Sequence, residues 1–363
     1  MIIGIDGNEA NVEKKVGVST YTFNLLYYFK KKANKNLQFK IYLRNNPLNL
    51  PDESKYFQYK IIKSNFLWSQ IFLPIELYKN KEIDVFFSPA HYLPRFCPVP
   101  SVVTIHDLSY LYYPQDFLKK DLFQLKYWTN YSIKQAKKII AVSKTTKKDI
   151  IKNNHLPENK VEVVYNGFEK NIKYDKSIDV KFEAANNPFI LYVGTLQPRK
   201  NIQTLIKAFE KLKKIYPEFK LIIAGKKGWL YEKIFQLVQN LGLENDVYFT
   251  DYVSDLQLMF LYKNAFCFVM PSFYEGFGIP VLEAMSYNCP VISSFSSSLP
   301  EIAGEAALYF DPKNEYDLVE KLKLLKENKQ LKNELIKKGQ KRINEFSWQK
   351  CADETLKVIQ SAF

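Results

Sequence analysis

The chain has 363 residues with a formal net charge of +14, and 47% of its residues are hydrophobic and 25% charged. This composition is typical of a soluble globular protein that is long enough for two domains of ordinary size. It excludes a membrane-spanning protein, because no run approaches the roughly 20 apolar residues that a transmembrane helix needs. The four cysteines include no CxxC pair, which argues against a zinc site or a disulfide framework and fits a reducing cytoplasm.

The excess of positive charge lies mainly in the first half of the chain. Residues 1–169 carry 25 Lys and Arg against 15 Asp and Glu, whereas residues 170–363 carry 27 against 23. A basic face can meet phosphates, nucleic acid or an anionic membrane, and it can equally be the solvated surface of a lysine-rich protein. No nucleic-acid-binding motif accompanies the charge, so we expect no nucleic-acid partner.

The first half alternates short β-rich runs with helical patterns, as a parallel sheet with crossover helices does. The chain opens directly on the run "MIIGID", so we expect no signal peptide. The predicted helices are "STYTFNLLYYFKKK", "DLFQLKYWTNYSIKQAKK" and "SKTTKKDIIKNN", and Ser143 is placed to cap the third. The predicted strands lie at residues 1–6, 39–44, 59–64, 84–89, 102–107, 138–143 and 161–166.

The second half repeats this alternation. Helical patterns occur at residues 201–216, 230–242 and 255–265. The segment after Asp311 is mostly helical, and its end, "FSWQKCADETLKVIQ", is amphipathic. The predicted strands lie at residues 189–195, 220–225, 247–252, 265–272, 290–294 and 307–312.

Between the halves, the polar and poorly periodic segment 169–188 is the predicted linker. We therefore expect an α/β fold with two doubly wound parallel sheets in series. Ligands of such sheets bind just outside the carboxyl ends of the strands, so the loops that follow the strands are where a site is expected.

Two cations follow the predicted strand at 189–195. Gly194 lies at the end of that strand, and Arg199 and Lys200 precede a helix that begins near Asn201. The N–H groups and the dipole of a helix N-terminus favour an anion, and two cations reinforce that preference. The arrangement suits a diphosphate, although a solvated basic turn has the same pattern.

Two carboxylates lie eight positions apart in the stretch "PSFYEGFGIPVLEAM". We expect Glu275 in the loop after a strand and Glu283 in the first turn of a helix that Pro280 opens. The helix dipole accounts for a carboxylate in the first turn but not for Glu275. Because a carboxylate accepts hydrogen bonds from two neighbouring hydroxyls, one glutamate fits a ribose and the other a sugar. Gly276 and Gly278 would let the backbone between them approach the phosphates or adopt positive φ.

His106 and Asp107 end the predicted strand at 102–107 in the first half. A histidine at the carboxyl end of a strand can hydrogen-bond a sugar oxygen, whereas a lone histidine is more often structural. Gly17 precedes the first predicted helix and would let the backbone approach a phosphate or an acceptor, although a turn glycine has the same appearance.

The strand-end loops contain no D-x-D motif, and the chain has no HxH cluster. Carboxylates would normally hold a divalent cation at a diphosphate. We therefore expect a metal-independent site in which Arg199, Lys200 and helix termini neutralise the charge.

Three segments of the second half, "YVGTLQPRKNIQTLIKAF", "PSFYEGFGIPVLEAM" and "SSLPEIAGEAALYFDP", resemble the C-terminal domain of the retaining GT-B glycosyltransferases of family 4. The spacing of Glu275 and Glu283 is similar to the E-x7-E element that is the hallmark of that family. In the first half "TIHDL", "AVSKTTKKDI" and "VVYNGF" also match, so the resemblance covers nearly the whole chain. It is closest to the bacterial mannosyltransferase-like members that build O-antigen or other surface polysaccharides.

The resemblance implies the GT-B architecture, in which two Rossmann-like domains face a cleft. Residues 1–168 would form the acceptor-binding domain, and residues 189–345 would form the domain that binds the nucleotide-sugar donor. The C-terminal helix at 346–363 would pack toward the N-terminal domain.

The resemblance also implies roles for individual residues. Glu275 would bind hydroxyls of the donor sugar, and Glu283 would bind the ribose diol. Arg199 and Lys200 would stabilise the leaving diphosphate, and His106 would lie near the transferred sugar. The remaining implied contacts are Asp107 at the loop or the acceptor, the backbone of Tyr252 and Val253 at the base, and the backbone of Gly17, Gly194, Gly276, Phe277, Gly278 and Ile279 at the sugar and phosphates.

One loop departs from the family, which often reads Gly-x-Gly-Arg-Tyr near its N-terminus. Here the segment is Gly17, Val18, Ser19, Thr20 and Tyr21. Ser19 replaces the second glycine and Thr20 the arginine, which puts the contacts of this loop in question.

The resemblance implies a hexosyltransferase that retains configuration. Because no residue is an obvious nucleophile, we expect this transfer to occur by front-face substitution. The expected donor is GDP-mannose, from the resemblance alone, and UDP-, dTDP- or other GDP-linked sugars are alternatives. The expected acceptor is a glycan or a lipid-linked glycan, the expected location is the cytoplasm, and no cofactor or metal is expected.

An apolar segment, "NFLWSQIFLPIELYK", lies in the basic first half. One interpretation is a membrane-facing or acceptor-facing patch that holds the protein at the inner face of an anionic cytoplasmic membrane. The other interpretation is a core helix under the sheet. The residues that would form the patch are Phe66, Leu67, Trp68, Ile71 and Phe72.

Two other functional classes fit a two-domain α/β chain. A sugar-nucleotide epimerase or phosphorylase shares the architecture, but the E-x7-E element argues against it. A non-enzymatic sugar-binding protein of the periplasmic type also has two domains. The direct opening on a strand and the Arg199–Lys200 pair argue against that class.

Overall fold

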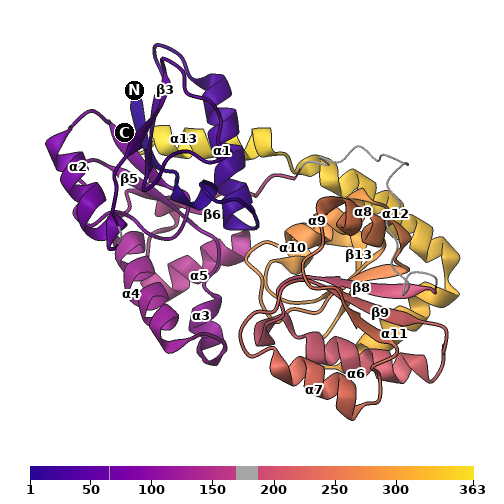
Figure 1. Cartoon of the computed structure of the whole chain (residues 1–363). Coiled ribbons are helices and arrows are strands. Elements are labelled where there is room, and N and C mark those ends of the chain that lie inside the picture. Colours follow the sequence, from indigo (N-terminus) through magenta and orange to yellow (C-terminus); the bar gives the residue numbers. More distant parts are fainter. Residues whose placement is uncertain (65, 169–186) are drawn as a thin grey trace. The chain divides into compact units, whose positions relative to one another are not determined.

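The computed structural model describes residues 1–64, 66–168 and 187–363 (Figure 1). The predicted linker comprises residues 169–188, and residues 169–186 of it lie outside the described part of the chain. The chain divides into two compact units. The first unit comprises Met1–Tyr112, Leu118–Gly167 and Phe346–Phe363, and the second comprises Tyr113–Phe117 and Phe168–Glu345.

The first unit is built on a seven-stranded parallel sheet with the strand order β3-β2-β1-β4-β5-β6-β7. The chain moves outward from β1 to β3, crosses back to β4 and then moves outward on the other side. This reversal makes the sheet doubly wound. The strands are β1 Ile2–Asp6, β2 Gln38–Leu43, β3 Phe57–Ile61, β4 Val85–Ser88, β5 Ser101–Ile105, β6 Lys138–Ala141 and β7 Val161–Val163.

Helices cover both faces of this sheet. Right-handed crossovers place α1 on one face and α2, α4 and α5 on the other, because the chain moves in opposite directions along the sheet. Ser143 caps α5, since its Oγ accepts a hydrogen bond from the Thr146 amide at 3.1 Å. The helices are α1 Val18–Lys32, α2 Leu73–Lys79, α3 Ser109–Tyr112, α4 Lys119–Gln135, α5 Lys144–Asn154 and α13 Trp348–Gln360.

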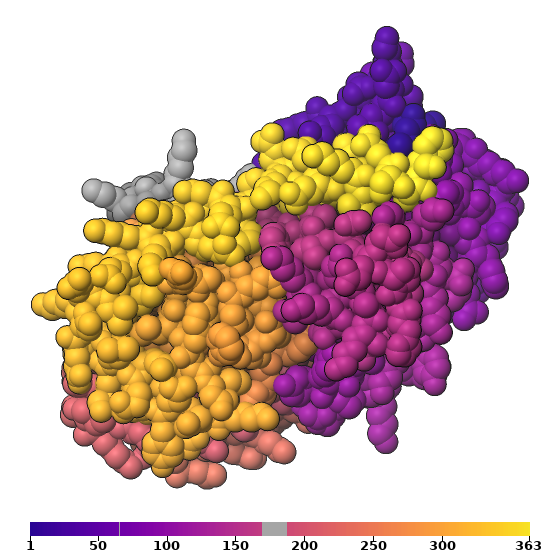
Figure 2. Space-filling model, turned by 180° about the vertical axis from the view of Figure 1, so that it is seen from behind, coloured from indigo at the N-terminus to yellow at the C-terminus, as the bar shows by residue number. Residues whose placement is uncertain are grey.

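The C-terminal helix α13 belongs to the core of the first unit. It packs against α1, β5 and β6, and in the space-filling view it fills a yellow strip between the indigo and magenta parts of that unit (Figure 2). Trp348, Ala352 and Leu356 recur every four residues and face inward, as the amphipathic pattern predicts. Gly167 makes room for this helix, because a Cβ there would lie 2.3 Å from the Trp348 backbone.

The second unit repeats the topology with six parallel strands in the order β10-β9-β8-β11-β12-β13. The α/β fold class with two doubly wound sheets is thereby confirmed. The strands are β8 Phe189–Val193, β9 Lys220–Ala224, β10 Val247–Phe249, β11 Cys267–Met270, β12 Val291–Ser294 and β13 Ala307–Phe310. The helices are α6 Ile202–Lys213, α7 Glu232–Asn240, α8 Asp255–Asn264, α9 Ile279–Ser286, α10 Leu299–Ala303, α11 Glu315–Glu327 and α12 Lys329–Arg342.

Candidate functional site

The turn that carries Arg199 and Lys200 follows β8 and is fixed by one asparagine. The turn is a short 3₁₀ segment, Pro198–Lys200, and Asn201 follows it in the left-handed conformation. The Asn201 amide donates to the carbonyls of Pro271 at 3.0 Å and Pro312 at 2.7 Å. These hydrogen bonds tie the turn to the loops that follow β11 and β13. Both loops begin at the carboxyl ends of the strands.

Glu275 lies in the loop after β11 and joins both cations of that turn. Its Oε1 accepts a hydrogen bond from Lys200 Nζ at 2.6 Å, and its Oε2 lies 3.7 Å from an Arg199 nitrogen. Ser272 Oγ donates to the same Oε1 at 2.6 Å. The Glu275 residue is only 7% exposed, so this cluster is a buried ion pair with several hydrogen bonds.

Electrostatics keep the Glu275 carboxyl ionised. Burial by itself would raise the pKa of this group, but Lys200 and Arg199, together with the hydrogen bonds from Lys200 and Ser272, hold the pKa below its usual value. A carboxylate that stays charged can offer acceptors to hydroxyl groups.

Serines after β12 hold the backbone of this loop, and sequence analysis did not predict them. Ser297 Oγ accepts from the Glu275 amide at 2.8 Å and also donates to its carbonyl at 2.9 Å. Ser298 Oγ lies within hydrogen-bond distance of the carbonyls of Glu275 and Phe277. The available signal was a run of serines just beyond the carboxyl end of a predicted strand.

Glu283 lies farther into helix α9 than the sequence predicted. The helix begins at Ile279 with Pro280 as its second residue, so Glu283 is the fifth helical residue and lies beyond the first turn. The dipole explanation for Glu283 is therefore wrong. Burial raises the pKa of its carboxyl, against the effect of the Tyr262 hydroxyl, which donates to Oε2 at 3.0 Å.

The other predicted donor-site residues of the second unit lie in strand-end loops or at a helix start. Gly194 directly follows β8 with φ of 154°, and Gly278 caps α9 with φ of 107°. Gly276 is not among the residues with positive φ. Tyr252 is 45% exposed, and Lys226 Nζ lies 5.1 Å from its ring centre. Val253 lies in the same loop after β10, Phe277 is buried, and Ile279 is the first residue of α9.

His106 directly follows β5 in the first unit and is held as a neutral imidazole. Its Nε2 lies 2.8 Å from the Pro89 carbonyl, which can only accept, so Nε2 carries the proton. Burial and the neighbouring His91 lower the pKa of His106 to about 4, against the opposing effects of that hydrogen bond and of Asp107. The Nδ1 atom of His106 is consequently an acceptor at neutral pH.

Two other predicted residues of the first unit have local structural roles. Asp107 Oδ1 accepts from the amide of Ser109 at 3.0 Å and from its hydroxyl at 2.7 Å, and so starts α3. Gly17 caps α1 with φ of 54°. His91, which the sequence analysis did not select, lies beside His106 with the ring centres 5.6 Å apart. It follows β4 as His106 follows β5, and that position was the signal that could have found it.

The structure thus brings Arg199, Lys200 and Glu275 into direct contact, whereas Glu283 lies against Tyr262. His106, Asp107 and Gly17 belong to the first unit. Within the described residues no group of three or more His, Cys, Asp and Glu side chains could hold a metal ion. No helix of the described chain is long and apolar enough to cross a membrane.

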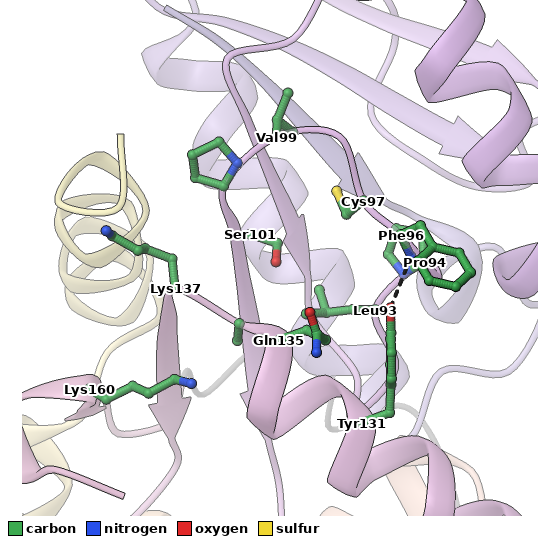
Figure 3. Close-up of a pocket in the computed structure, with 12 residues that line it drawn as sticks. Leu93, Pro94, Phe96, Cys97, Val99, Ser101, Tyr131, Gln135, Lys137 and Lys160 are labelled. Carbon is green, nitrogen blue, oxygen red and sulfur yellow. Dashed lines mark hydrogen bonds between the residues drawn. The ribbon is translucent and has the colours of Figure 1, made fainter.

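One hollow of about 450 Å³ lies in the first unit, at the end of the sheet opposite to His106 (Figure 3). Ser101 begins β5 and Lys137 precedes β6, so this hollow opens at the amino ends of the strands. Tyr131 OH accepts from the Phe96 amide at 2.9 Å across its rim. Because ligands of doubly wound sheets bind at the carboxyl ends, we do not assign the hollow to the candidate site.

Comparison with known proteins gives the family. The family model described as "Glycosyltransferase Family 4" matches residues 17–171, and the model described as "Glycosyl transferases group 1" matches residues 174–342. O-antigen chain mannosyltransferase B of Escherichia coli is 32% identical over 291 residues, which cover 76% of this chain and 74% of that protein. The chain belongs to the GT-B glycosyltransferases of family 4.

Other relatives and solved structures agree with this membership. O-antigen chain mannosyltransferase RfbU of Salmonella typhimurium is 35% identical over 59% of this chain and 57% of its own length. Sucrose-phosphate synthase from Thermosynechococcus elongatus has a TM-score of 0.77 at 18% identity, with 99% of this chain and 98% of that chain covered. Anabaena HepE, solved with UDP and glucose, has a TM-score of 0.74 at 18% identity, with 99% of each chain covered. The structural likenesses show the fold, and the family membership makes this glycosyltransferase a hexosyltransferase.

Proposed function

We propose that this glycosyltransferase moves mannose from GDP-mannose onto a glycan or lipid-linked glycan, with retention of configuration and without a metal ion. The observation that carries the proposal is the buried cluster of Arg199, Lys200 and Glu275 at the carboxyl edge of the second sheet. The choice of mannose and of a glycan acceptor is supported by the names of the two O-antigen mannosyltransferases to which the chain is similar.

The cluster has the chemistry that departure of a nucleoside diphosphate requires. When the bond from the anomeric carbon to the diphosphate oxygen breaks, negative charge grows on the leaving group. Arg199 and Lys200 would stabilise that charge, and a fixed array of donors in a water-poor site is an effective way to do so. Glu275 balances the two cations in the absence of donor and would accept hydrogen bonds from sugar hydroxyls when the donor is bound.

Front-face substitution accounts for retention without a protein nucleophile. The acceptor oxygen would bond to the anomeric carbon on the face that the diphosphate leaves, and its proton would pass to a diphosphate oxygen. The protein would then contribute position and electrostatic stabilisation. In the same proposal Glu283 binds the ribose diol, and the backbone near Tyr252 and Val253 contacts the base.

Replacement of both cations tests the proposal. We expect Arg199→Ala with Lys200→Ala to lower kcat by about 10²–10³, by analogy with the loss of an electrostatic donor. Lys211 and Lys214 provide a matched control, because both pair with one glutamate, Glu210, on helix α6 of the same unit. Their double alanine variant should keep its turnover. Wild-type turnover in the Arg199 and Lys200 variant would contradict the proposal.

The donor is tested by thermal shift with a panel of GDP-, UDP- and dTDP-linked sugars. A ligand that binds the folded state raises stability by RT ln(1 + [L]/Kd), so the correct nucleotide should give the largest shift. Selective stabilisation by UDP or dTDP compounds would replace GDP-mannose in the proposal. Transfer that survives EDTA would support metal independence, and a loss restored by Mg²⁺ or Mn²⁺ would refute it.

We also propose peripheral contact with an anionic membrane at its cytoplasmic side. The surface that makes this contact differs from the predicted patch. Trp68 is 2% exposed and its indole donates to the Ile62 carbonyl, so it belongs to the core and not to the predicted patch. Phe72 is half-buried. Five large apolar side chains of this region are exposed instead: Phe66, Leu67, Ile71, Ile75 and Tyr78.

Helix α4 adds a similar exposed surface on the same face of the first sheet. Phe123 is 59% exposed and Tyr127 is 62% exposed, and their rings lie 4.4 Å apart one helical turn from each other. Lys119, Lys120 and Lys126 are exposed on the same helix. Exposed aromatic side chains among lysines complement an anionic lipid surface.

Flotation with vesicles that contain phosphatidylglycerol tests this contact. We expect the wild type to float with the vesicles, and Phe66→Ser, Ile71→Ser and Ile75→Ser in one chain to reduce the floating fraction severalfold. A matched control replaces Ile215, Phe295 and Leu324, which are similarly exposed in the second unit. Equal flotation of the two triple variants, or no flotation of the wild type, would remove the membrane proposal.

A further inference from the structure

His91 has an unusual backbone conformation next to His106. Its φ is 42°, in the left-handed region that residues other than glycine seldom adopt, although His is among those that do so more often. Its amide donates to the Thr104 carbonyl at 3.0 Å, which fixes the loop after β4 to the last residues of β5. This hydrogen bond holds the two imidazoles beside each other at the carboxyl edge of the sheet.

The two ring nitrogens of His91 differ in their surroundings. Its Nδ1 is buried and has no hydrogen-bond partner among the described residues. Its Nε2 is neither hydrogen-bonded nor buried within the described part of the chain, so it reaches the surface. A buried N–H without an acceptor is costly, and the proton therefore belongs on Nε2, where water or a ligand can accept it.

The same argument keeps His91 neutral. Protonation would place an unsatisfied N–H and a positive charge at the buried Nδ1. Burial accordingly lowers the pKa of His91, against the opposing effect of Asp107. His91 is thus a neutral donor through Nε2, whereas His106 is a neutral acceptor through Nδ1.

We propose that His91 and His106 form a pair that binds one sugar of the acceptor, with His91 Nε2 as donor and His106 Nδ1 as acceptor. A hydroxyl group both donates and accepts, and two neighbouring hydroxyls offer the same complement, so an uncharged sugar matches this pair. A phosphate diester has no proton to give His106 at neutral pH and matches it poorly. This inference rests on the proposed function. In it His91 is an acceptor-binding residue that lies outside the family motifs of this chain.

Three variants of His91 separate binding from folding. Asn tolerates positive φ, so His91→Asn should fold as well as the wild type, but its amide reaches only the position of Nδ1. Gln is longer, and His91→Gln places an amide nitrogen near the position of Nε2. His91→Ala removes both polar positions. Circular dichroism and the melting temperature check that each variant is folded.

The first measurement is transfer from GDP-mannose to methyl α-mannoside and to α-mannobiose as acceptor probes. We expect His91→Asn and His91→Ala to raise KM for the acceptor about tenfold, as the loss of one hydrogen bond to a buried partner does, with KM for the donor unchanged. His91→Gln should stay within about threefold of the wild type. An unchanged acceptor KM in His91→Asn, or an equal change in donor KM, would overturn the inference.

The second measurement does not need turnover. The chain has three histidines, so ¹⁵N-labelled histidine gives few signals, and the His91 variants assign them. Addition of α-mannobiose should shift the His91 and His106 nitrogens and leave His155 unchanged. No shift would overturn the inference. A shift without transfer from any donor of the panel would refute the proposed function and keep the sugar site.

Discussion

The two sheets of this glycosyltransferase have the same topology but present different chemistry at their carboxyl edges. The edge of the first sheet carries two neutral imidazoles, His91 and His106, whose pKa values burial lowers. The edge of the second sheet carries a buried carboxylate that two cations keep ionised. Burial acts on the titratable groups at both edges, so the difference arises from the partners that each loop supplies.

This difference fits the two halves of a group-transfer reaction. Neutral donors and acceptors suit an uncharged sugar, whereas a cluster of fixed charges suits a diphosphate. Burial disfavours the charged form in both places. At Glu275 two neighbouring cations outweigh burial, whereas at His106 the opposing effect of Asp107 does not. One fold therefore supplies two kinds of site through residues that directly follow its strands.

The largest expected effect comes from removal of the charge at the second edge. Glu275→Gln leaves Lys200 and Arg199 without their carboxylate in a buried place, and the loss of one partner of a buried ion pair costs about 3–5 kcal/mol. We expect the free energy of unfolding of the second unit to fall by that amount in urea denaturation. Glu305→Gln is the control, because the ion pair of Glu305 with Lys338 is exposed. It should change the free energy of unfolding by less than about 1 kcal/mol.

At the carboxyl edge of the first sheet, the dependence of stability on pH should reveal the neutral His106. The pKa of His106 is about 4 in the folded protein and about 6.5 when unfolded, so between these values the unfolded chain binds the proton and the folded chain does not. Stability should therefore fall as pH drops from 6.5 to 4, by up to about 3 kcal/mol from this group.

The variant His106→Gln sharpens that test, because its amide can still donate to the Pro89 carbonyl but does not titrate. We expect a flatter dependence of the unfolding free energy on pH between 4 and 6.5. His155→Asn, at the exposed left-handed cap of α5, is the matched control variant. An equally steep profile in His106→Gln would contradict the buried neutral imidazole.

Glycines at the two edges differ in the space beside them. Gly278 has φ of 107°, and a Cβ there would lie 2.8 Å from a Leu299 methyl group, so Gly278→Ala should cost about 2 kcal/mol from strain and overpacking. Gly17 has φ of 54°, but nothing lies within 4 Å of a Cβ, so Gly17→Ala should cost about 1 kcal/mol. Melting temperatures of the two variants compare these costs directly, and an equal loss would show that space does not matter here.

The smallest expected effect concerns Glu283. Tyr262→Phe removes the hydroxyl that donates to its carboxylate at 3.0 Å, which should raise the pKa of Glu283 further and cost about 1 kcal/mol. If Glu283 binds the ribose, calorimetry should give a severalfold weaker Kd for the donor nucleotide. An unchanged Kd would separate Glu283 from the nucleotide site.

The sequence predicted the strands better than the helices. Each predicted strand overlaps a strand of the structure, because runs rich in β-branched and aromatic residues are a local signal. The strand at 59–64 begins earlier, at Phe57. Helices α3 and α10 were not predicted, since they are only four and five residues long. A core helix was one of the two interpretations of the apolar segment that contains α2.

The candidate site was predicted in part. Arg199, Lys200 and Glu275 were expected near one ligand, and the structure adds that they bind one another, which their spacing of 75 residues does not reveal. The position of Glu283 was wrong by one residue, which places it just beyond the first turn, because a proline marks the start of a helix only to within a residue or two. The position of His91 and of the serines after strands was the available signal, but their partners are distant in the sequence, so no local pattern shows what they contact.

The place of α13 has a consequence for biosynthesis. Residues 346–363 complete the core of the first unit, and about 180 residues of the second unit come between them and residue 167. At the usual rates of translation, roughly 10–35 s pass after residue 167 is made before this helix follows. During that interval Trp348 and Ile359 are absent, and the apolar surface that they cover is open to a chaperone. The second unit is continuous apart from five residues, so its folding does not wait in this way for a segment far away in the sequence.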